Sequence, residues 1–256
     1  MQLDLTGRRV LVTGGGQGIG RGIALGFADA GAEVVVNDIS ADRAEAVVRE
    51  VDKLGGTAVA AVFDVTDHPS VLSAVDALGG VDVLVNNAGN GGVVGFAGRG
   101  AFAESEPADW EPYLRVNLYG VMHCARAVLP GMIAKGWGRV ITIVSDAGRT
   151  GDAQMAAYSA AKAGAAGLTR ALARETGRHG ITVNNIALGT MRTPQTEAIW
   201  ADPEDVLAKA MLRSYIVRRP GVPDDVAPLT LFLASEHASW ITGQTYPLNG
   251  GFSFAL

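Results

Sequence analysis

Short apolar runs alternate with longer amphipathic segments along almost the whole chain. The runs are rich in β-branched residues and nearly continuous, which is typical of parallel strands whose two faces are both covered. They predict strands over residues 8–13, 33–37, 58–63, 81–86, 139–145, 181–187 and 244–248. The segments between them have the length and pattern of helices, over residues 19–30, 41–54, 69–78, 107–134 and 152–178.

This alternation predicts the fold class. Strand–helix–strand units form parallel sheets, and right-handed crossovers then produce a doubly wound topology. We therefore expect an α/β protein with a Rossmann-like doubly wound parallel sheet and helices on both faces. No linker, repeat or low-complexity tract interrupts the alternation, so residues 1–256 are expected to form a single domain.

Two segments depart from the alternation. Residues 90–103 are rich in glycine, and residues 190–220 mix proline, tryptophan and charged side chains. Both follow predicted strands, and loops at the carboxyl ends of parallel strands border the ligand crevice of such sheets. We expect both segments to form walls of a substrate site, with residues 190–220 covering it; the alternative is that they are ordinary surface loops.

Composition and charge exclude several classes of protein. Hydrophobic residues make up 48% of the chain and charged residues 18%, which excludes a disordered or fibrous protein. The net charge is −5, and Lys and Arg are scattered singly, so neither a nucleic acid nor an anionic membrane is an expected partner. No apolar stretch is long enough for a membrane span.

Cysteine and histidine usage also bears on location and cofactors. The one cysteine, Cys124, cannot form an internal disulfide, and residues 1–5 lack the features of a signal peptide. A cytoplasmic protein is therefore expected. The four histidines stand far apart, without metal-ligand spacing, and no metal is predicted.

A glycine-rich turn follows the first predicted strand, with the sequence TGGGQGIG over Thr13–Gly20. Glycines permit positive φ and let backbone N–H groups approach a pyrophosphate at the start of the next helix. Asp38 ends the second strand, near the spacing of about 20 residues at which an acid bonds an adenosine ribose. The pattern predicts a dinucleotide site, rather than a merely tight turn, that includes Gly14, Gln17, Gly18, Ile19, Gly20, Asp38 and Ile39.

Tyr158 and Lys162 lie four residues apart, on one face of a predicted helix. A neighbouring ammonium favours the phenolate, so the pair suits proton exchange with an alcohol or carbonyl oxygen while a nicotinamide exchanges hydride with the carbon. Ser145 ends the fifth strand and would hydrogen-bond the same oxygen. A tyrosine and lysine at this spacing are common, so the prediction depends on the upstream glycine loop and on Ser145.

These motifs occur in order with four more: Asp64-Val65, Asn86–Gly89, Asn117 and Asn249–Gly251. Over essentially the whole chain the sequence resembles the classical short-chain dehydrogenase/reductase family. The resemblance implies the catalytic set Asn117, Ser145, Tyr158 and Lys162. It further implies that Lys162 bonds the nicotinamide ribose and that Asn117 holds a helix kink and a proton-relaying water; otherwise Asn117 is an ordinary polar helix residue.

The resemblance also implies the remaining cofactor contacts. The adenine would meet Asp64 and Val65, and the adenosine and ribose would meet Asn87, Ala88 and Gly89. After the sixth strand the family usually carries Pro-Gly-x3-Thr, but in this chain Leu188 replaces the proline. The residues implied there, at the carboxamide and pyrophosphate, are Gly189, Met191 and Thr193.

The choice between NAD and NADP depends on Asp38. This carboxylate should accept hydrogen bonds from the adenosine 2′-hydroxyl and would repel a 2′-phosphate. Gln17, Ile39 and Ser40 supply no compensating cation, and Arg43 is expected to have a solvated role one turn into the next helix. NAD is therefore the predicted cofactor.

The substrate is less specified. A carboxylate, Asp146, follows Ser145 directly, as in family members that oxidise alicyclic or β-hydroxyacyl coenzyme A thioesters; the alternative is a local ion pair with Arg149. Related 3-oxoacyl reductases and hydroxysteroid or sugar alcohol dehydrogenases share the same core. A non-catalytic NAD-sensing regulator is a further alternative, although such proteins usually lose the tyrosine or lysine.

The resemblance implies a homotetramer acting on a small molecule. The helix over residues 152–178 is rich in alanine and glycine, which permits close approach of a second helix. The same small residues could instead pack against the helix's own sheet.

Overall fold

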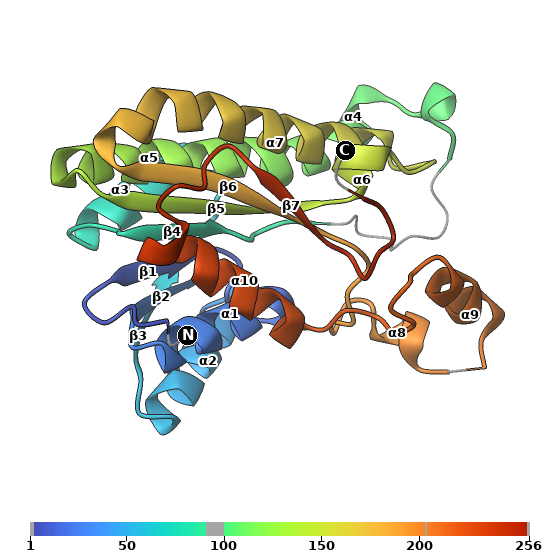
Figure 1. Ribbon diagram of the computed structural model, residues 1–256. Coiled ribbons are helices and arrows are strands. Elements are labelled where there is room, and N and C mark those ends of the chain that lie inside the picture. Colours follow the sequence, from blue (N-terminus) through green and yellow to red (C-terminus); the bar gives the residue numbers. More distant parts are fainter. Residues whose placement is uncertain (1–2, 91–99, 203, 255–256) are drawn as a thin grey trace.

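The computed structural model describes residues 3–90, 100–202 and 204–254. Its centre is a seven-stranded sheet in the order β3-β2-β1-β4-β5-β6-β7 (Figure 1), with every pair parallel. The predicted α/β doubly wound fold is thereby confirmed. The strands are β1 (Arg9–Val12), β2 (Glu33–Asp38), β3 (Thr57–Val62), β4 (Val83–Asn86), β5 (Gly138–Ser145), β6 (Ile181–Leu188) and β7 (Thr245–Leu248).

Helices cover both faces of the sheet (Figure 1). One face carries α1 (Gly18–Asp29), α2 (Ala41–Lys53) and α10 (Pro223–Ala234). The other carries α3 (His68–Ala77), α5 (Gly120–Lys135) and α7 (Ala156–Thr176). The strand order reverses between β1 and β4, and a crevice at such a switch point is where open α/β sheets bind ligands.

The hydrophobic core lies on both sides of the sheet, which explains the continuous apolar strands. In β1, Val10 and Val12 join the cluster on one face and Leu11 joins the cluster on the other. All three are fully buried. The expectation of two buried faces is wrong for β3, which is an edge strand with β2 as its neighbour and exposed or half-buried side chains.

The predicted helix over residues 107–134 is interrupted. It consists of α4 (Pro107–Leu114), a π-helical turn η2 (Arg115–Tyr119) and α5. The helix predicted to start at residue 152 begins at Ala156, because Gln154 adopts a positive φ of 64° that a right-handed helix cannot contain. It continues into a 3-10 turn, η3 (Gly177–His179).

Helix α10 was not anticipated from the hydrophobic pattern. Pro223 stands in its first turn, where a missing N–H costs no intrahelical bond, and Pro228 lies inside it. Two prolines in twelve residues argue against a helix in the sequence, although the apolar face of α10 packs on α1. The other unanticipated elements are short: η1 (Phe102–Glu104), α6 (Ala147–Thr150), α8 (Glu197–Trp200), α9 (Val206–Arg213) and η4 (Glu236–Ala238).

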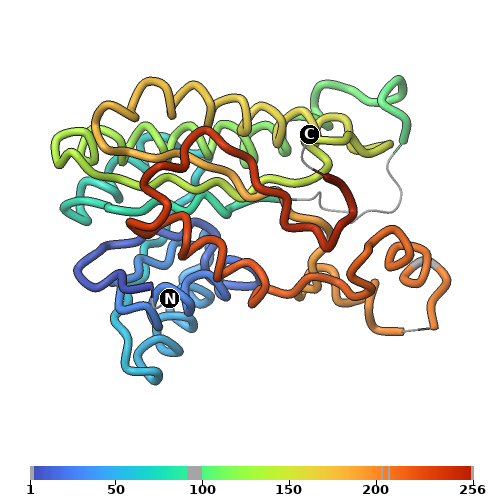
Figure 2. The backbone as a smooth tube through the Cα atoms, viewed as in Figure 1, coloured from blue at the N-terminus to red at the C-terminus, as the bar shows by residue number. Residues whose placement is uncertain are grey.

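The chain over residues 190–220 leaves β6 and projects from the sheet before α10 returns to it (Figure 2). It contains α8 and α9. A parallel bridge between Met191 and Gly221 closes its base. Of the other predicted substrate wall, residues 90–103, the part over 91–99 lies outside the described residues.

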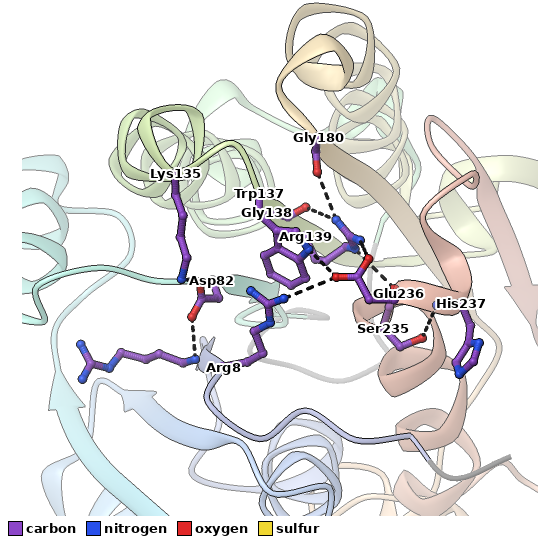
Figure 3. A network of polar contacts seen from close by, with 11 residues as sticks. Arg8, Asp82, Lys135, Trp137, Gly138, Arg139, Gly180, Ser235, Glu236 and His237 are labelled. Carbon is purple, nitrogen blue, oxygen red and sulfur yellow. Dashed lines mark hydrogen bonds and ion pairs between the residues drawn. The ribbon is translucent and has the colours of Figure 1, made fainter.

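A polar network lies at the amino-terminal ends of the strands (Figure 3). Arg139, 2% exposed, donates to Glu236 and to the carbonyls of Gly138 and Gly180. The guanidinium carbons of Arg8 and Arg139 lie 3.6 and 4.4 Å from the Trp137 ring centroid. Burial lowers the pKa of Arg139, and the Glu236 carboxylate opposes this effect. The network connects β5 to η4, away from the crevice.

Candidate active site

The glycine loop between β1 and α1 is shaped by close backbone contacts. Gly14 and Gly18 have φ values of 60° and 54°, which favour glycine. A Cβ on Gly20 would lie 2.2 Å from the Gly14 carbonyl oxygen. The loop is therefore a backbone cradle at the start of a helix, and it fits the pyrophosphate of a dinucleotide. The predicted Gln17 and Ile19 lie in the same turn, with Gln17 as N-cap.

The loop is attached to β4 by side-chain hydrogen bonds. The Asn87 amide donates to the carbonyls of Thr13 and Gly14, both at 3.0 Å. The Thr13 hydroxyl accepts from the backbone N–H groups of Asn87 and Ala88, both at 3.1 Å. These bonds hold the ends of β1 and β4 together at the switch point.

Asp38 is buried at the end of β2 and has several donors around it. It accepts from the backbone N–H groups of Gly16 and Ser40, at 3.2 and 3.0 Å. Arg43 binds it through Nε and Nη2, at 3.1 and 2.6 Å. Arg43 lies in the first turn of α2 with its side chain 41% exposed, as expected, but its guanidinium also turns back to bind Asp38. Ile39 is exposed beside them.

The turn after β3 is fixed against α5. The Thr66 N–H donates to Asp64 at 2.8 Å, and His123 donates from Nδ1 to the Val65 carbonyl at 2.9 Å. Val65 is buried, and a Cβ on Gly120 would lie 2.8 Å from its side chain. Asp64 and Val65 thus form a rigid turn at the carboxyl end of β3.

Lys162 is buried beneath Tyr158. Its ammonium donates to the Ile143 carbonyl at 2.9 Å and lies 5.9 Å from the centroid of the Tyr158 ring. Burial lowers the pKa of Lys162 from 10.5 to about 8. Tyr158 is half-buried in the first turn of α7, and Tyr113 approaches it edge-on at 6.3 Å between ring centroids. The Ser145 hydroxyl, at the end of β5, accepts from the Ala147 N–H at 3.2 Å.

Asn117 is fully buried in the π-helical turn η2. Its amide donates to the Tyr113 carbonyl at 3.1 Å and to the Asn90 side chain at 2.8 Å. Its carbonyl accepts from the Asn90 N–H at 3.3 Å. A Cβ on Gly89 would lie 2.9 Å from Asn117 Oδ1 and 3.4 Å from Lys162 Nζ. Asn117, Gly89 and Lys162 therefore meet at one place.

The segment after β6 keeps a compact form although Leu188 replaces the family's proline. The Thr190 N–H donates to the Tyr215 hydroxyl at 2.8 Å. Thr196 holds the following turn, because its hydroxyl donates to the Met191 carbonyl at 2.6 Å and accepts from the Thr193 N–H at 2.9 Å. The Thr193 side chain lies against Gly18, 3.6 Å from the position of a Cβ there. Thr193 thus borders the glycine loop.

A cavity of about 500 Å³ joins many of these residues. Its lining includes all four candidate catalytic residues, Asn117, Ser145, Tyr158 and Lys162, of which Tyr158 and Lys162 are also predicted cofactor contacts. Five further predicted cofactor contacts line it: Ile19, Asn87, Gly89, Gly189 and Met191. The other predicted cofactor contacts do not line it. They lie at the end of β2, in the loops after β1, β2, β3, β4 and β6, or in the first turn of α1, and are Gly14, Gln17, Gly18, Gly20, Asp38, Ile39, Asp64, Val65, Ala88 and Thr193.

The loop after Ser145 is tied to the carboxyl-terminal segment. Asp146 forms the local ion pair with Arg149, at 2.6 Å, and accepts from the Asn249 amide at 2.5 Å. Arg149 also donates to the Ser253 hydroxyl and the Phe254 carbonyl, at 2.8 and 2.7 Å. This arrangement places Phe252 in the cavity wall.

The sequence assigns no particular hydrogen bond to several cavity and loop residues. Asn90 begins the predicted segment 90–103, and Thr196 and Tyr215 lie in the predicted segment 190–220. Arg43 and Thr196 bond residues three to five positions away. Tyr215 and Asn249 bond residues 25 and 103 positions away, and such contacts have no local sequence signal. Across the described residues, no group of three or more His, Cys, Asp or Glu side chains is arranged to hold a metal. None of the described helices is long and apolar enough to cross a membrane.

Comparison with known proteins agrees with this geometry. The family model described as enoyl-(acyl carrier protein) reductase matches residues 14–253. The 7alpha-hydroxysteroid dehydrogenase of Escherichia coli K12 is 39% identical over 253 residues, covering 97% of this chain and 95% of that protein. The (2S)-[(R)-hydroxy(phenyl)methyl]succinyl-CoA dehydrogenase subunit BbsD of Thauera aromatica is 38% identical over 255 residues, covering 98% of each.

Solved structures also match along the whole chain. A gluconate 5-dehydrogenase from Burkholderia cenocepacia J2315, in complex with NADP and tartrate, has a TM-score of 0.90 and 35% identity, covering 100% of this chain and 98% of that one. A 7 alpha-hydroxysteroid dehydrogenase complexed with NADH and 7-oxo glycochenodeoxycholic acid has a TM-score of 0.88 and 38% identity, covering 98% and 96%.

Proposed function

The chain belongs to the classical short-chain dehydrogenase/reductase family, and from this premise we propose that it transfers hydride between NAD and a secondary alcohol or ketone. Membership of the family makes it an NAD(P)-dependent oxidoreductase acting on CH–OH groups. The alternative of a non-catalytic NAD sensor has no support, because the relatives are dehydrogenases and reductases.

The convergence of Ser145, Tyr158, Lys162 and Asn117 on one cavity supports the proposed roles most directly. In our proposal the Tyr158 hydroxyl exchanges a proton with the substrate oxygen, which Ser145 holds by a hydrogen bond. The buried Lys162 ammonium favours the Tyr158 phenolate electrostatically. Asn117, in the π-helical turn η2, holds the helix kink and a water that relays protons to Lys162. The nicotinamide, when bound, supplies hydride exchange at the substrate carbon.

The test of these roles is Tyr158→Phe. The variant should lose nearly all turnover while NAD affinity stays within a few fold, because the hydroxyl alone is removed. Turnover is measured against secondary alcohols and hydroxyacyl thioesters, and NAD binding by calorimetry. More than about a tenth of the wild-type kcat/KM remaining would contradict the assignment.

We propose NAD rather than NADP as the preferred cofactor, with Asp38 setting the choice. Asp38 lies at the end of β2, where it can accept from a ribose hydroxyl, and a 2′-phosphate beside it would meet like charge. Arg43 opposes this preference, because its guanidinium, which is bound to Asp38, can pair with a 2′-phosphate instead. Related structures contain NADH in one case and NADP in another.

The cofactor proposal is tested by kcat/KM with both cofactors for wild type, Asp38→Ala and Arg43→Ala. The wild type should prefer NAD, and Asp38→Ala should shift the ratio toward NADP by at least about tenfold. Arg43→Ala should shift it further toward NAD. A wild type that prefers NADP would show that Asp38 does not set the choice of cofactor. The same follows if Asp38→Ala and the wild type have equal ratios of kcat/KM for NAD and NADP.

For the substrate we propose a hydroxyacyl coenzyme A or alicyclic hydroxy thioester. It is supported by the sequence around Asp146 and by the likeness to the Thauera enzyme. The second candidate is a hydroxysteroid or sugar alcohol, favoured by the likeness to 7alpha-hydroxysteroid dehydrogenase and gluconate 5-dehydrogenase. A turnover screen across these classes separates the two.

We also propose a cytoplasmic homotetramer built from one catalytic domain per chain, with residues 190–220 covering the substrate. Tyr119, at the end of η2, and Met122 and Ile133, on α5, expose apolar side chains, and α5 lies beside α7, so this face could meet a second copy. Cys124 is the one cysteine of the chain and a buried free thiol, which fits a reducing compartment. Light scattering that gave a monomer at micromolar concentration would contradict the assembly.

A further inference from the structure

A second cavity, of about 430 Å³, lies next to the catalytic one. The two share four lining residues, Asn90, Gln154, Met155 and Tyr158. Small-molecule sites measure about 300–1,000 Å³ and are mostly apolar with few polar groups. The second cavity is therefore of a size to hold part of a ligand whose reacting end lies at Tyr158.

The far wall of this cavity is aromatic. Phe102 and Trp110 stack at 5.1 Å between ring centroids and 20° between planes. The Trp110 indole N–H donates to the Ser105 hydroxyl at 2.8 Å, and that hydroxyl donates to the Phe102 carbonyl at 2.7 Å. These bonds orient the indole, and Tyr113 extends the aromatic wall to Tyr158. Helix α4, which carries Trp110, lies beside the start of α7 (Figure 1).

We propose that this cavity, the aromatic subsite, binds an uncharged ring of the same substrate whose carbinol carbon reacts at Tyr158. Phe102 is 55% exposed, and a ring against it and Trp110 would remove apolar surface from water and stack favourably. Among its described lining residues the only charges are Glu104 and Asp109, both negative, which disfavours a carboxylate there. The inference rests on the proposed oxidoreductase function and specifies its substrate class.

The test compares two ketones that differ by one ring, cyclohexanone and 4-phenylcyclohexanone, with the reduced cofactor at saturation. The wild type should favour the phenyl compound in kcat/KM by about tenfold or more, since burial of a ring is worth at least that factor. In Trp110→Ala this preference should fall about tenfold, mainly through KM, and Trp110→Phe should retain most of it. An equal preference in wild type and Trp110→Ala would overturn the proposal.

Two controls sharpen the experiment. Trp240→Ala makes the same change at a side chain that is 98% exposed, and it should leave the ring preference unchanged. The third ketone, 4-(4-oxocyclohexyl)benzoic acid, adds a carboxylate to the second ring and should lose about tenfold in kcat/KM against 4-phenylcyclohexanone. Equal kcat/KM for these two compounds would contradict the proposal that the aromatic subsite prefers an uncharged ring.

Binding separates this inference from the proposed function. Calorimetry with 4-phenylcyclohexanol and the cofactor-loaded protein should show affinity that Trp110→Ala weakens and Trp240→Ala does not. Such binding without turnover of any ketone would refute the proposed chemistry while supporting the aromatic subsite. Absence of binding, or an affinity equal in wild type and Trp110→Ala, would refute the subsite itself.

Discussion

Replacing Lys162 by methionine should stabilise the protein at neutral pH while removing its activity. Lys162 is 6% exposed, and the hydrogen bond of its ammonium goes to a neutral carbonyl, that of Ile143. Burial lowers its pKa from 10.5 to about 8, a difference that corresponds to a cost of about 3 kcal/mol for the charged form in the folded state. Methionine has a similar length and carries no charge.

The sign of the pH dependence follows from proton binding. The unfolded chain holds the Lys162 proton more tightly than the folded one, so the cost is fully present below pH 8. Between pH 8 and 10.5 the folded protein releases this proton first, and its stability rises with pH. At pH 7 the variant avoids this cost, which raises its free energy of unfolding by about 3 kcal/mol, but it lacks the hydrogen bond to Ile143, which lowers that free energy by about 1 kcal/mol. A net gain of about 2 kcal/mol should therefore become a loss of about 1 kcal/mol well above pH 10.

The assay is urea unfolding of cofactor-free wild type and Lys162→Met at equal protein concentration, from pH 7 to pH 10.5. Taking the difference in unfolding free energy at each pH cancels the titration of all other groups. Lys53→Met, at an exposed lysine in the last turn of α2, is the matched control and should show a difference that is constant with pH. A constant difference for Lys162→Met as well, or a less stable variant at pH 7, would refute the reasoning.

Other predictions concern the glycine loop and the network of Figure 3. Gly20→Ala should weaken NAD binding by about tenfold or more, measured by calorimetry, because its Cβ would lie 2.2 Å from the Gly14 carbonyl oxygen. Gly131→Ala, where a Cβ meets open space, should leave binding intact. Glu236→Gln removes the countercharge of buried Arg139 and should cost about 1 kcal/mol in urea unfolding, a value reduced because Glu236 is 65% exposed. Glu204→Gln, at an exposed pair with Lys209, should cost less than about 0.5 kcal/mol; equal losses would contradict the role of burial.

All seven predicted strands are present, with limits that agree within about two residues. In β1, β2, β4, β5 and β6 the apolar runs are continuous because these strands are buried on both faces. The edge strand β3 shows the same composition with exposed alanines and valines, because a missing neighbour leaves no mark in composition. The sequence does not predict α10, because proline inside a segment normally indicates that no helix forms there. The packing of the folded chain allows this helix in spite of Pro228.

The candidate site divides in the same way. Gly14 to Gly20 and Tyr158 with Lys162 are set by local spacing, which the sequence displays directly. The contact of Arg43 with Asp38, five residues before it, depends on the geometry of the turn between β2 and α2. The contact of Asn249 with Asp146 joins residues 103 positions apart, so it is a property of the folded chain and has no local sequence signal.

Two buried cations illustrate how a structural role and a functional one differ in this fold. Arg139 has Glu236, three backbone carbonyls and the Trp137 ring around it, so the fold offsets part of the cost of burying its charge, although burial still lowers its pKa. Lys162 has one carbonyl and the edge of a cavity, and its pKa falls to about 8. A cost that the fold leaves uncompensated is typical of functional sites. A phenolate at Tyr158 would place a negative charge near the Lys162 ammonium and so stabilise its charged form. The same attraction favours loss of the Tyr158 proton, which is the step that proton transfer to the substrate requires.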